Sequence, residues 1–252
     1  MDKILIGSKA IKHWYSDFSR EPKDIDYAVL NNDVYKTVKG IEYLPNPILI
    51  DLYQGSNKSV LEPNHLLTLK ASHLCWNINW AKHMYDVQFL LKKGHVIDKD
   101  LFFNLYHFWN KYHSKNKRSD LKMTKEEFFT NAINYDTCEH DDLHKIINPV
   151  PMYTLVLKDN CEVELDKNKF YALSHQDKIR FVQEEVMVMA WERYRSKNYR
   201  VAFDMMLKKF IINHCPLFAL LFTIENYLEI LKININYIKQ INHELGTIKR
   251  GA

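Results

Sequence analysis

Three aspartates lie in short apolar segments where a carboxylate could do chemistry. Asp24 and Asp26 are two positions apart, and Asp51 interrupts the apolar run Ile48–Tyr53. Side chains two apart on a strand point to the same face, so Asp24 and Asp26 are predicted to converge. A charge inside an apolar strand is costly unless it is paired or metal-bound, which applies to Asp51. Because hard divalent cations prefer carboxylate oxygens, the three aspartates are predicted to form a magnesium site.

A glycine–serine pair, Gly7-Ser8, follows the apolar run Ile4–Ile6 and precedes a helical pattern. The start of a helix offers free backbone N–H groups and the positive end of the helix dipole, and both favour phosphate. Taken singly, these features are ordinary, because a lone Asp-x-Asp is usually solvated surface and glycines are common in turns. The carboxylate of Asp51 inside an apolar run favours the catalytic interpretation.

Together, these residues resemble the signature of the nucleotidyltransferase superfamily related to DNA polymerase beta, and they look most like its minimal and toxin-type members. The resemblance implies that Gly7 and Ser8 hold the nucleotide phosphates. It also implies that Asp24 and Asp26 bind two Mg2+ (or Mn2+) ions, and that Asp51 shares a metal ion and activates the attacking hydroxyl. Two metal ions can stabilise both the attacking and the leaving oxygen of an in-line displacement.

The resemblance covers residues 1–95 and implies an α+β fold. We expect a catalytic domain over these residues, with a mixed sheet and flanking helices, followed by a mostly helical acceptor-binding domain over residues 96–252. The chain departs from the family pattern in the polar stretch Ser16–Pro22, which is predicted to form a loop between a helix and a strand.

Two lysines in the long helical pattern Pro63–Lys93 are candidate nucleotide ligands. Lys82 and Asp86 are four residues apart, and this spacing resembles the Lys/Arg-Asp-x-x-Asp-Leu region of toxin-type nucleotidyltransferases, in which the basic residue meets the nucleotide. A surface ion pair worth about 0.2–0.5 kcal/mol explains the same spacing and is the favoured interpretation of Asp86. Lys70, inside an apolar turn, is predicted to bind the triphosphate.

A second candidate metal site lies at His140, Asp141 and His144. The order of the upstream His107 and His113, the pair His140-Asp141 and the later acids Glu184-Glu185 faintly resembles the HD phosphohydrolases, although that family ends on Asp. Helix capping and loop hydrogen bonding is the favoured interpretation of the three residues.

Composition limits the classes of function. The net charge of +4 is modest, and the basic-aromatic segments Lys111–Arg118 and Arg193–Arg200 can either bind nucleic acid or be solvated ends of elements. The apolar run Pro216–Ile224 is too short to span a bilayer, and the N-terminal segment Met1–Ile6 is too short to be a signal peptide. Four widely spaced cysteines indicate reduced thiols, so a cytoplasmic protein that does not enter a membrane is expected. The abundance of Lys, Asn, Ile and Tyr favours an AT-rich genome, such as that of a virus or phage.

The remaining pattern predicts the other elements. Strands are expected at 40–44, 48–53 and 153–157, and helices at 101–109, from 124, and at 178–195, 200–214 and 216–232.

The predicted function is metal-dependent transfer of a nucleoside monophosphate from an NTP, such as ATP, to a hydroxyl acceptor with release of pyrophosphate. The acceptor is expected to be a nucleic-acid end such as that of tRNA or another RNA, or a protein. Two alternatives remain open at this point. One is an HD-type phosphohydrolase acting on nucleotides, and the other is a catalytically dead module that binds nucleic acid or protein.

Overall fold

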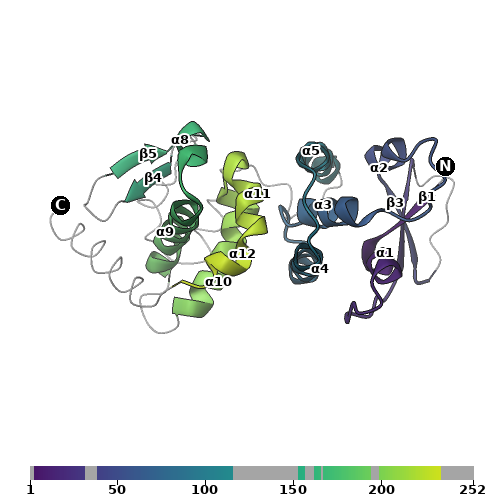
Figure 1. The fold of residues 1–252 in the computed structure, drawn as a ribbon, viewed down its shortest axis with the longest axis horizontal. Coiled ribbons are helices and arrows are strands. Elements are labelled where there is room, and N and C mark those ends of the chain that lie inside the picture. Colours follow the sequence, from purple (N-terminus) through teal and green to yellow (C-terminus); the bar gives the residue numbers. More distant parts are fainter. Residues whose placement is uncertain are drawn as a thin grey trace. The chain divides into compact units, whose positions relative to one another are not determined.

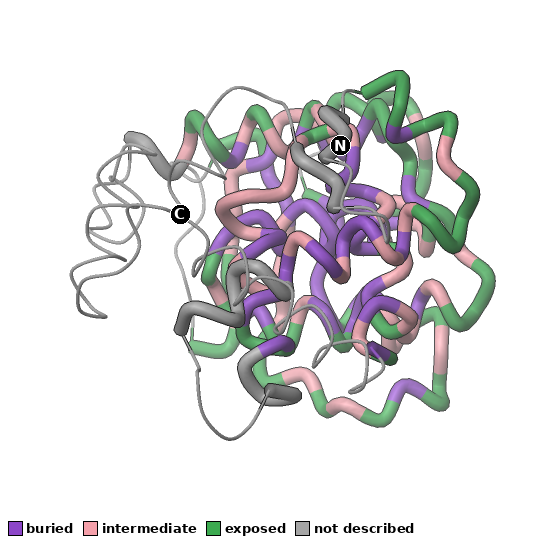
Figure 2. Tube along the Cα trace, turned by 90° about the vertical axis from the view of Figure 1, so that its left-hand side faces the viewer, coloured by how far each residue is buried: buried purple, intermediate pink, exposed green. Residues whose placement is uncertain are grey.

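The computed structural model describes residues 3–31, 39–115, 153–156, 162–165, 167–193 and 199–233 (Figure 1). The chain divides into two compact units, Met1–Lys122 and Met123–Ala252. Both combine a small sheet with helices, so the α+β class is confirmed. Along the tube in Figure 2, buried stretches alternate with exposed ones, as expected of elements that each turn one side to a core.

The first unit begins with a three-stranded mixed sheet. Its strands are β1 (Lys3–Ile6), β2 (Ile25–Val29) and β3 (Ile41–Pro45), in the spatial order β1-β2-β3. Strand β2 is antiparallel to β1 and parallel to β3. Ile4 and Ile6 of β1 alternate with the less buried Lys3 and Leu5, and Ile4 is paired with the buried Ala28 of β2, so these side chains form the core side of the sheet. The strand predicted at 40–44 is confirmed, because it corresponds to β3.

The described residues of the same unit form the helix α1 (Gly7–Trp14) between β1 and β2, and then α2 (Pro47–Leu52), α3 (Pro63–His73), α4 (Trp80–Lys92) and α5 (Lys99–Lys115). The predicted strand 48–53 is wrong, because this segment forms α2. The buried Asn46 caps the helix, since its Oδ1 accepts a hydrogen bond of 3.1 Å from the backbone N–H of Leu49. Pro47 sits in the first turn, where a missing N–H costs nothing.

The predicted long helix 63–93 is interrupted between His73 and Trp80, and it forms the two helices α3 and α4, which pack against each other. The break ends at Asn79, which adopts a left-handed backbone conformation with φ of 49°. Asparagine tolerates that conformation better than most residues. The second helix ends, as predicted, before Gly94. The break places residues of α3 opposite residues of α4.

The predicted domain boundary at 95/96 differs from the division in the structure, which falls after Lys122. Helix α5 belongs to the first unit because it packs against α3. The indole Nε1 of the buried Trp109 donates a 3.1 Å hydrogen bond to Ser72 Oγ, and its ring lies 4.6 Å from that of His73. Removing this side chain should therefore weaken the unit.

We expect Trp109→Ala to lower the free energy of unfolding by about 3–5 kcal/mol, since it opens a cavity and leaves the Ser72 hydroxyl without its donor. Urea unfolding followed by circular dichroism measures this change. His107→Ala, at an exposed position of the same helix, is the control and should change stability by less than about 0.5 kcal/mol. A loss for Trp109→Ala no larger than that of the control would contradict the assignment of α5 to this core.

The second unit contains the antiparallel pair β4 (Tyr153–Val156) and β5 (Glu162–Leu165). Its helical elements are α8 (Lys167–Ala172), α9 (His175–Arg193), α10 (Tyr199–Lys209), a π-helical turn (Phe210–His214), α11 (Leu217–Glu225) and α12 (Tyr227–Ile230). The short strand and the helices predicted at 178–195, 200–214 and 216–232 are thus present, although the second helix ends in the π-helical turn and the third is divided into α11 and α12. The helix predicted from 124 lies outside the described residues. No helix in the described ranges combines the length and the apolar character that a bilayer crossing requires.

Candidate metal and nucleotide site

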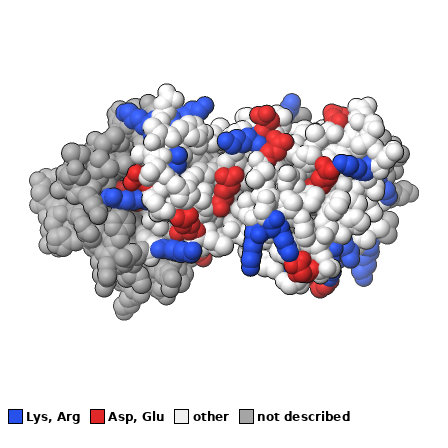
Figure 3. Space-filling model, viewed as in Figure 1, with Lys and Arg blue, Asp and Glu red and all other residues white. Residues whose placement is uncertain are grey.

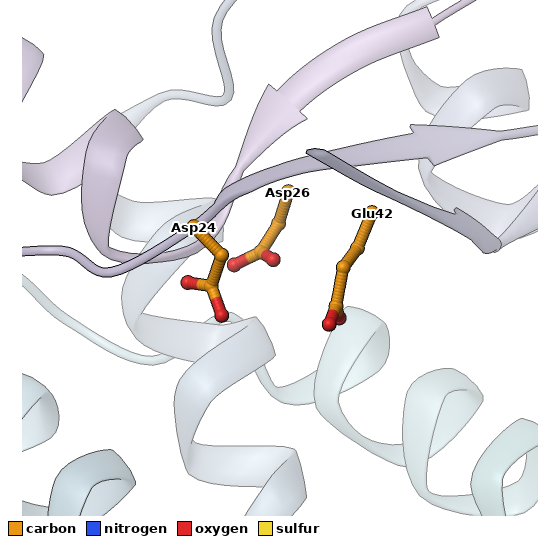
Figure 4. A group of neighbouring side chains, drawn as sticks. All are labelled: Asp24, Asp26 and Glu42. Atoms are coloured by element: carbon orange, nitrogen blue, oxygen red, sulfur yellow. The ribbon is translucent and has the colours of Figure 1, made fainter. Parts of the chain in front are cut away.

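Three carboxylates meet where β1 ends and where β2 and β3 begin. Ligand oxygens of Asp24, Asp26 and Glu42 lie within 4.8 Å of one another. Asp24 precedes β2, Asp26 lies in it, and the strand register places Glu42 of β3 directly beside Asp26. Figure 4 shows the three side chains pointing to the same side of the two strands. We call this group the acidic cluster.

Burial and neighbouring negative charges disfavour the ionised form of Asp26 in the acidic cluster. Burial is the largest of the causes that raise the pKa of Asp26 to about 6, and the negative charges of Asp24 and Glu42 act in the same direction. The cations Lys70 and Arg20 act in the opposite direction and lower it. A carboxylate with this environment gains more than an exposed one from a bound cation. Oxygen ligands from three carboxylates are the donor set that Mg2+ or Mn2+ prefers.

Gly7 provides the space that the Asp26 side chain occupies. Its φ of 70° is in the left-handed region, which glycine adopts at little cost. A Cβ at this position would lie 2.9 Å from Asp26 Cγ and closer still to Asp26 Oδ2. The glycine is therefore required both by the backbone turn into α1 and by the close approach of the carboxylate.

The third carboxylate of the acidic cluster differs from the predicted one. Asp51 lies exposed on α2, whereas Glu42, which sequence reasoning passed over, joins Asp24 and Asp26. A signal for it existed, because Ile41-Glu42-Tyr43 alternates in a segment predicted to be a strand. The apolar run around Asp51 suits a strand, but it forms a short capped helix, so the carboxylate is exposed to solvent.

A second group of charged residues meets beside the acidic cluster, centred on the fully buried Asp86 of α4. Arg20 donates to Asp86 from Nε at 3.0 Å and from Nη2 at 2.7 Å. Lys70 Nζ of α3 lies 3.1 Å from Asp86 Oδ2, and the Ser8 hydroxyl donates to the same oxygen at 3.2 Å. Arg20 also donates to Ser8 Oγ. We call Ser8, Arg20, Lys70 and Asp86 the Asp86 hub.

The Asp86 hub corrects one prediction and leaves two others as predictions. Asp86 is not half of a surface pair with Lys82, because it is buried and its cations are Lys70 and Arg20. Lys82 is exposed on α4. The predicted roles of Lys70 and Lys82 in nucleotide binding remain predictions, and of the two lysines Lys70 is electrostatically coupled to Asp26.

The polar stretch Ser16–Pro22, the predicted loop between α1 and β2, brings Arg20 to the hub. Several contacts hold it along α4. Phe18 is buried with its ring 5.0 Å from that of Phe89, and Ser19 Oγ lies 2.6 Å from the Tyr85 hydroxyl. Asp17 forms a 2.6 Å ion pair with Lys93, just after α4. The stretch is thus an ordered part of the site and not a spacer.

Other predicted functional residues lie outside the described residues. These are His140, Asp141 and His144 of the second candidate metal site, Asn116–Arg118 of the first basic segment and all of the second basic segment except its ends. Lys111 lies exposed near the end of α5. Among the described residues, the acidic cluster is the one group of at least three side chains with metal-ligand spacing.

Comparison with known proteins places the chain in a family. Residues 65–245, more than half of the chain, match the family described as a domain of unknown function, DUF7275, and the chain belongs to it. The matched residues include Lys70 and Asp86 but not the acidic cluster. No curated protein and no solved structure matches the chain.

Proposed function

We propose that this member of the DUF7275 family is a metal-dependent nucleotidyltransferase. The reaction is transfer of a nucleoside monophosphate from an NTP to a hydroxyl acceptor, with pyrophosphate as the leaving group. The observation that carries the proposal is the acidic cluster, in which Asp24, Asp26 and Glu42 bring ligand oxygens within 4.8 Å of one another. A turn into a helix N-terminus lies directly beside it at Gly7.

The residues present suit magnesium or manganese. The donor set is entirely carboxylate oxygen, and the absence of a side chain at Gly7 leaves Asp26 room at the start of α1. Asp24, Asp26 and Glu42 would hold the ions. Bound there, the ions would neutralise phosphate charge and lower the pKa of the acceptor hydroxyl.

The chain's own groups have separate roles in this proposal. The backbone N–H groups at the start of α1 and the cation Lys70 stabilise the negative phosphates. Asp26, whose pKa is raised to about 6, is ionised at neutral pH and accepts the cation in preference to a proton. Positioning and charge neutralisation account for most of the catalysis in phosphoryl transfer, and the site supplies both.

The distribution of surface charge bears on the class of acceptor. On the face drawn in Figure 3, basic and acidic side chains are interspersed over the described residues of each unit, so these residues form no single-sign surface there for a long nucleic acid. We propose a single hydroxyl at an RNA end, such as that of a tRNA, or on a protein as the acceptor.

The experiment is incubation of the full chain with each α-labelled NTP, Mg2+ or Mn2+, and total RNA, comparing the wild type with Glu42→Gln and Asp51→Asn. We expect Glu42→Gln to reduce label transfer by about a hundredfold or more, because it removes a charged cation ligand. Asp51→Asn is the matched control and should retain transfer within about twofold, since this carboxylate is exposed like that of Glu42 but lies on α2, outside the cluster.

The reverse result, with Asp51 required and Glu42 dispensable, would overturn the assignment of the third ligand. Absence of label transfer to RNA or protein from every NTP would overturn the transferase. Dephosphorylation of nucleotides that survives Asp24→Ala/Asp26→Ala would instead support the HD-type alternative, which depends on His140 and Asp141. RNA binding without any reaction would support the binding module.

A further inference from the structure

The Asp86 hub brings together four parts of the chain that are far apart in sequence. Ser8 lies in the first turn of α1, Arg20 belongs to the stretch before β2, Lys70 lies on α3 and Asp86 on α4. Two cations share one carboxylate that has no exposed surface. With one carboxylate against two cations, the hub carries one net positive charge, next to the three carboxylates of the acidic cluster.

Loop docking alone does not account for this arrangement. The stretch that carries Arg20 is already held on α4 by the buried Phe18 and by the contacts of Ser19 with Tyr85 and Asp17 with Lys93. Burying a carboxylate with two cations costs desolvation, and apolar residues of similar volume often stabilise such a position as well or better. A role beyond stability is therefore the more economical explanation of the charged residues.

The hub adjoins the acidic cluster through Ser8. The Ser8 hydroxyl donates to Asp86 and accepts a hydrogen bond from Arg20. Ser8 is next in the chain to Gly7, whose missing Cβ accommodates Asp26. The side chains of Arg20 and Lys70 keep 24% and 8% of their surface exposed, whereas that of Asp86 keeps none, so a ligand can reach the two cations, and Arg20 most readily.

We propose that the Asp86 hub is the phosphate-binding half of the site, in which Arg20 and Lys70 contact the phosphates of a nucleoside triphosphate that are not transferred. Asp86 is a positioning residue that holds both cations in place and does not touch the nucleotide. The assignment rests on the proposed function and adds Arg20 and Asp86 to it. A planar guanidinium suits this task, because it can bond to a carboxylate and present further N–H donors to phosphate.

The test measures binding of inorganic tripolyphosphate and of a fluorescent, nonhydrolysable NTP analogue to the full chain, in wild type, Arg20→Gln, Asp86→Asn and the double variant. We expect Arg20→Gln to raise both Kd values about 10–100-fold. Asp86→Asn should raise them by a similar factor although it is buried away from the ligand. Because Asp86 acts through the cations, the double variant should lose less binding free energy than the sum of the two single losses.

Two further variants separate positioning from general damage. Lys93→Gln breaks the exposed ion pair that ties Asp17 to the end of α4, outside the hub, and should leave both Kd values within about twofold. Arg20→Lys keeps the positive charge but loses the planar guanidinium with its several N–H donors. It should recover part of the binding that Arg20→Gln loses. If Asp86→Asn fails to fold by circular dichroism, the comparison of Arg20→Gln with Arg20→Lys and Lys93→Gln decides the assignment.

Kd values within twofold of the wild type in folded Arg20→Gln would overturn the hub assignment, even if label transfer is observed. A wild type that binds neither tripolyphosphate nor the analogue would also overturn it. If the wild type binds both ligands, the hub variants weaken that binding and no label is transferred, the assignment of the hub as a phosphate site stands and the transferase proposal is overturned. Where transfer occurs, Arg20→Gln should raise KM for the NTP by a larger factor than it lowers kcat. The reason is that Arg20 contacts the phosphates in the bound substrate as well as in the transition state.

Discussion

Asp26→Asn is expected to reduce label transfer by about a thousandfold or more and, at the same time, to stabilise the metal-free protein at pH 7. The first effect follows from loss of the most buried member of the acidic cluster. The second follows from relief of desolvation and repulsion, because burial, Asp24 and Glu42 raise the pKa of Asp26 to about 6 from the ordinary 3.8. Thermal unfolding in EDTA, with and without added Mg2+, measures it.

The direction of the stability change follows from proton linkage. Between pH about 4 and about 6 the folded chain retains a proton on Asp26 that the unfolded chain has lost, so stability falls as pH rises through this window. A shift of this size corresponds to about 3 kcal/mol in a fully buried group, and the partial exposure of Asp26 reduces the expected gain for Asp26→Asn to about 1–2 kcal/mol. The expected rise in Tm is about 2–8 °C at pH 7.

The gain should shrink at pH 4, where Asp26 of the wild type is protonated. Added Mg2+ should stabilise the wild type and leave Asp26→Asn nearly unchanged, because a ligand that binds only the folded state raises stability by mass action. Asp51→Asn is the control and should show neither effect. A metal-free Asp26→Asn protein less stable than the wild type at pH 7 would contradict the raised pKa and the repulsion behind it.

Gly7→Ala is expected to cost about 2–5 kcal/mol of stability and to reduce transfer at least a hundredfold. An L-residue at φ of 70° costs about 1–2 kcal/mol. The new methyl group also meets Asp26, since it would lie 2.9 Å from Cγ and nearer to Oδ2, and overpacking adds about 1–3 kcal/mol. A displaced carboxylate can no longer place a cation correctly, and a shift of about 1 Å can cost about a hundredfold in rate.

Gly55→Ala separates the two causes. Gly55 also has a positive φ, 79°, but a Cβ there would meet no atom within 4 Å. We expect Gly55→Ala to lower the free energy of unfolding only by the backbone cost of about 1–2 kcal/mol and to keep full transfer. Equal stability losses at the two glycines, or full transfer by Gly7→Ala, would show that the contact between Gly7 and Asp26 does not matter for the site.

Local patterns determined those parts of the candidate site that depend on neighbours in the chain. The start of α1 at Gly7 followed from an apolar strand ending in Gly-Ser, and the common direction of Asp24 and Asp26 followed from the period of a strand. The strand of Glu42 was also predictable, although its carboxylate was not singled out. In each case one or two neighbouring residues determine the backbone conformation.

Local sequence patterns gave the wrong secondary structure where the same residues are compatible with both a strand and a helix. The run from Ile48 to Tyr53 suits a strand or a buried helical turn equally well, since its length is below that which periodicity can decide. The side-chain cap at Asn46 and Pro47 in the first turn decide for the helix. The interruption between α3 and α4 was missed for a similar reason, because a single left-handed asparagine leaves the apolar pattern on either side unchanged.

The sequence by itself therefore determined the mixed α+β class, the turn at Gly7 and two of the three carboxylates. Only the tertiary structure decided the rest. Glu42 joins the acidic cluster because β3 pairs in parallel with β2 at one register, and the Asp86 hub exists because α3 and α4 fold back on each other. Strand pairing and helix packing join residues tens of positions apart, and no local period in the chain encodes which of them will meet.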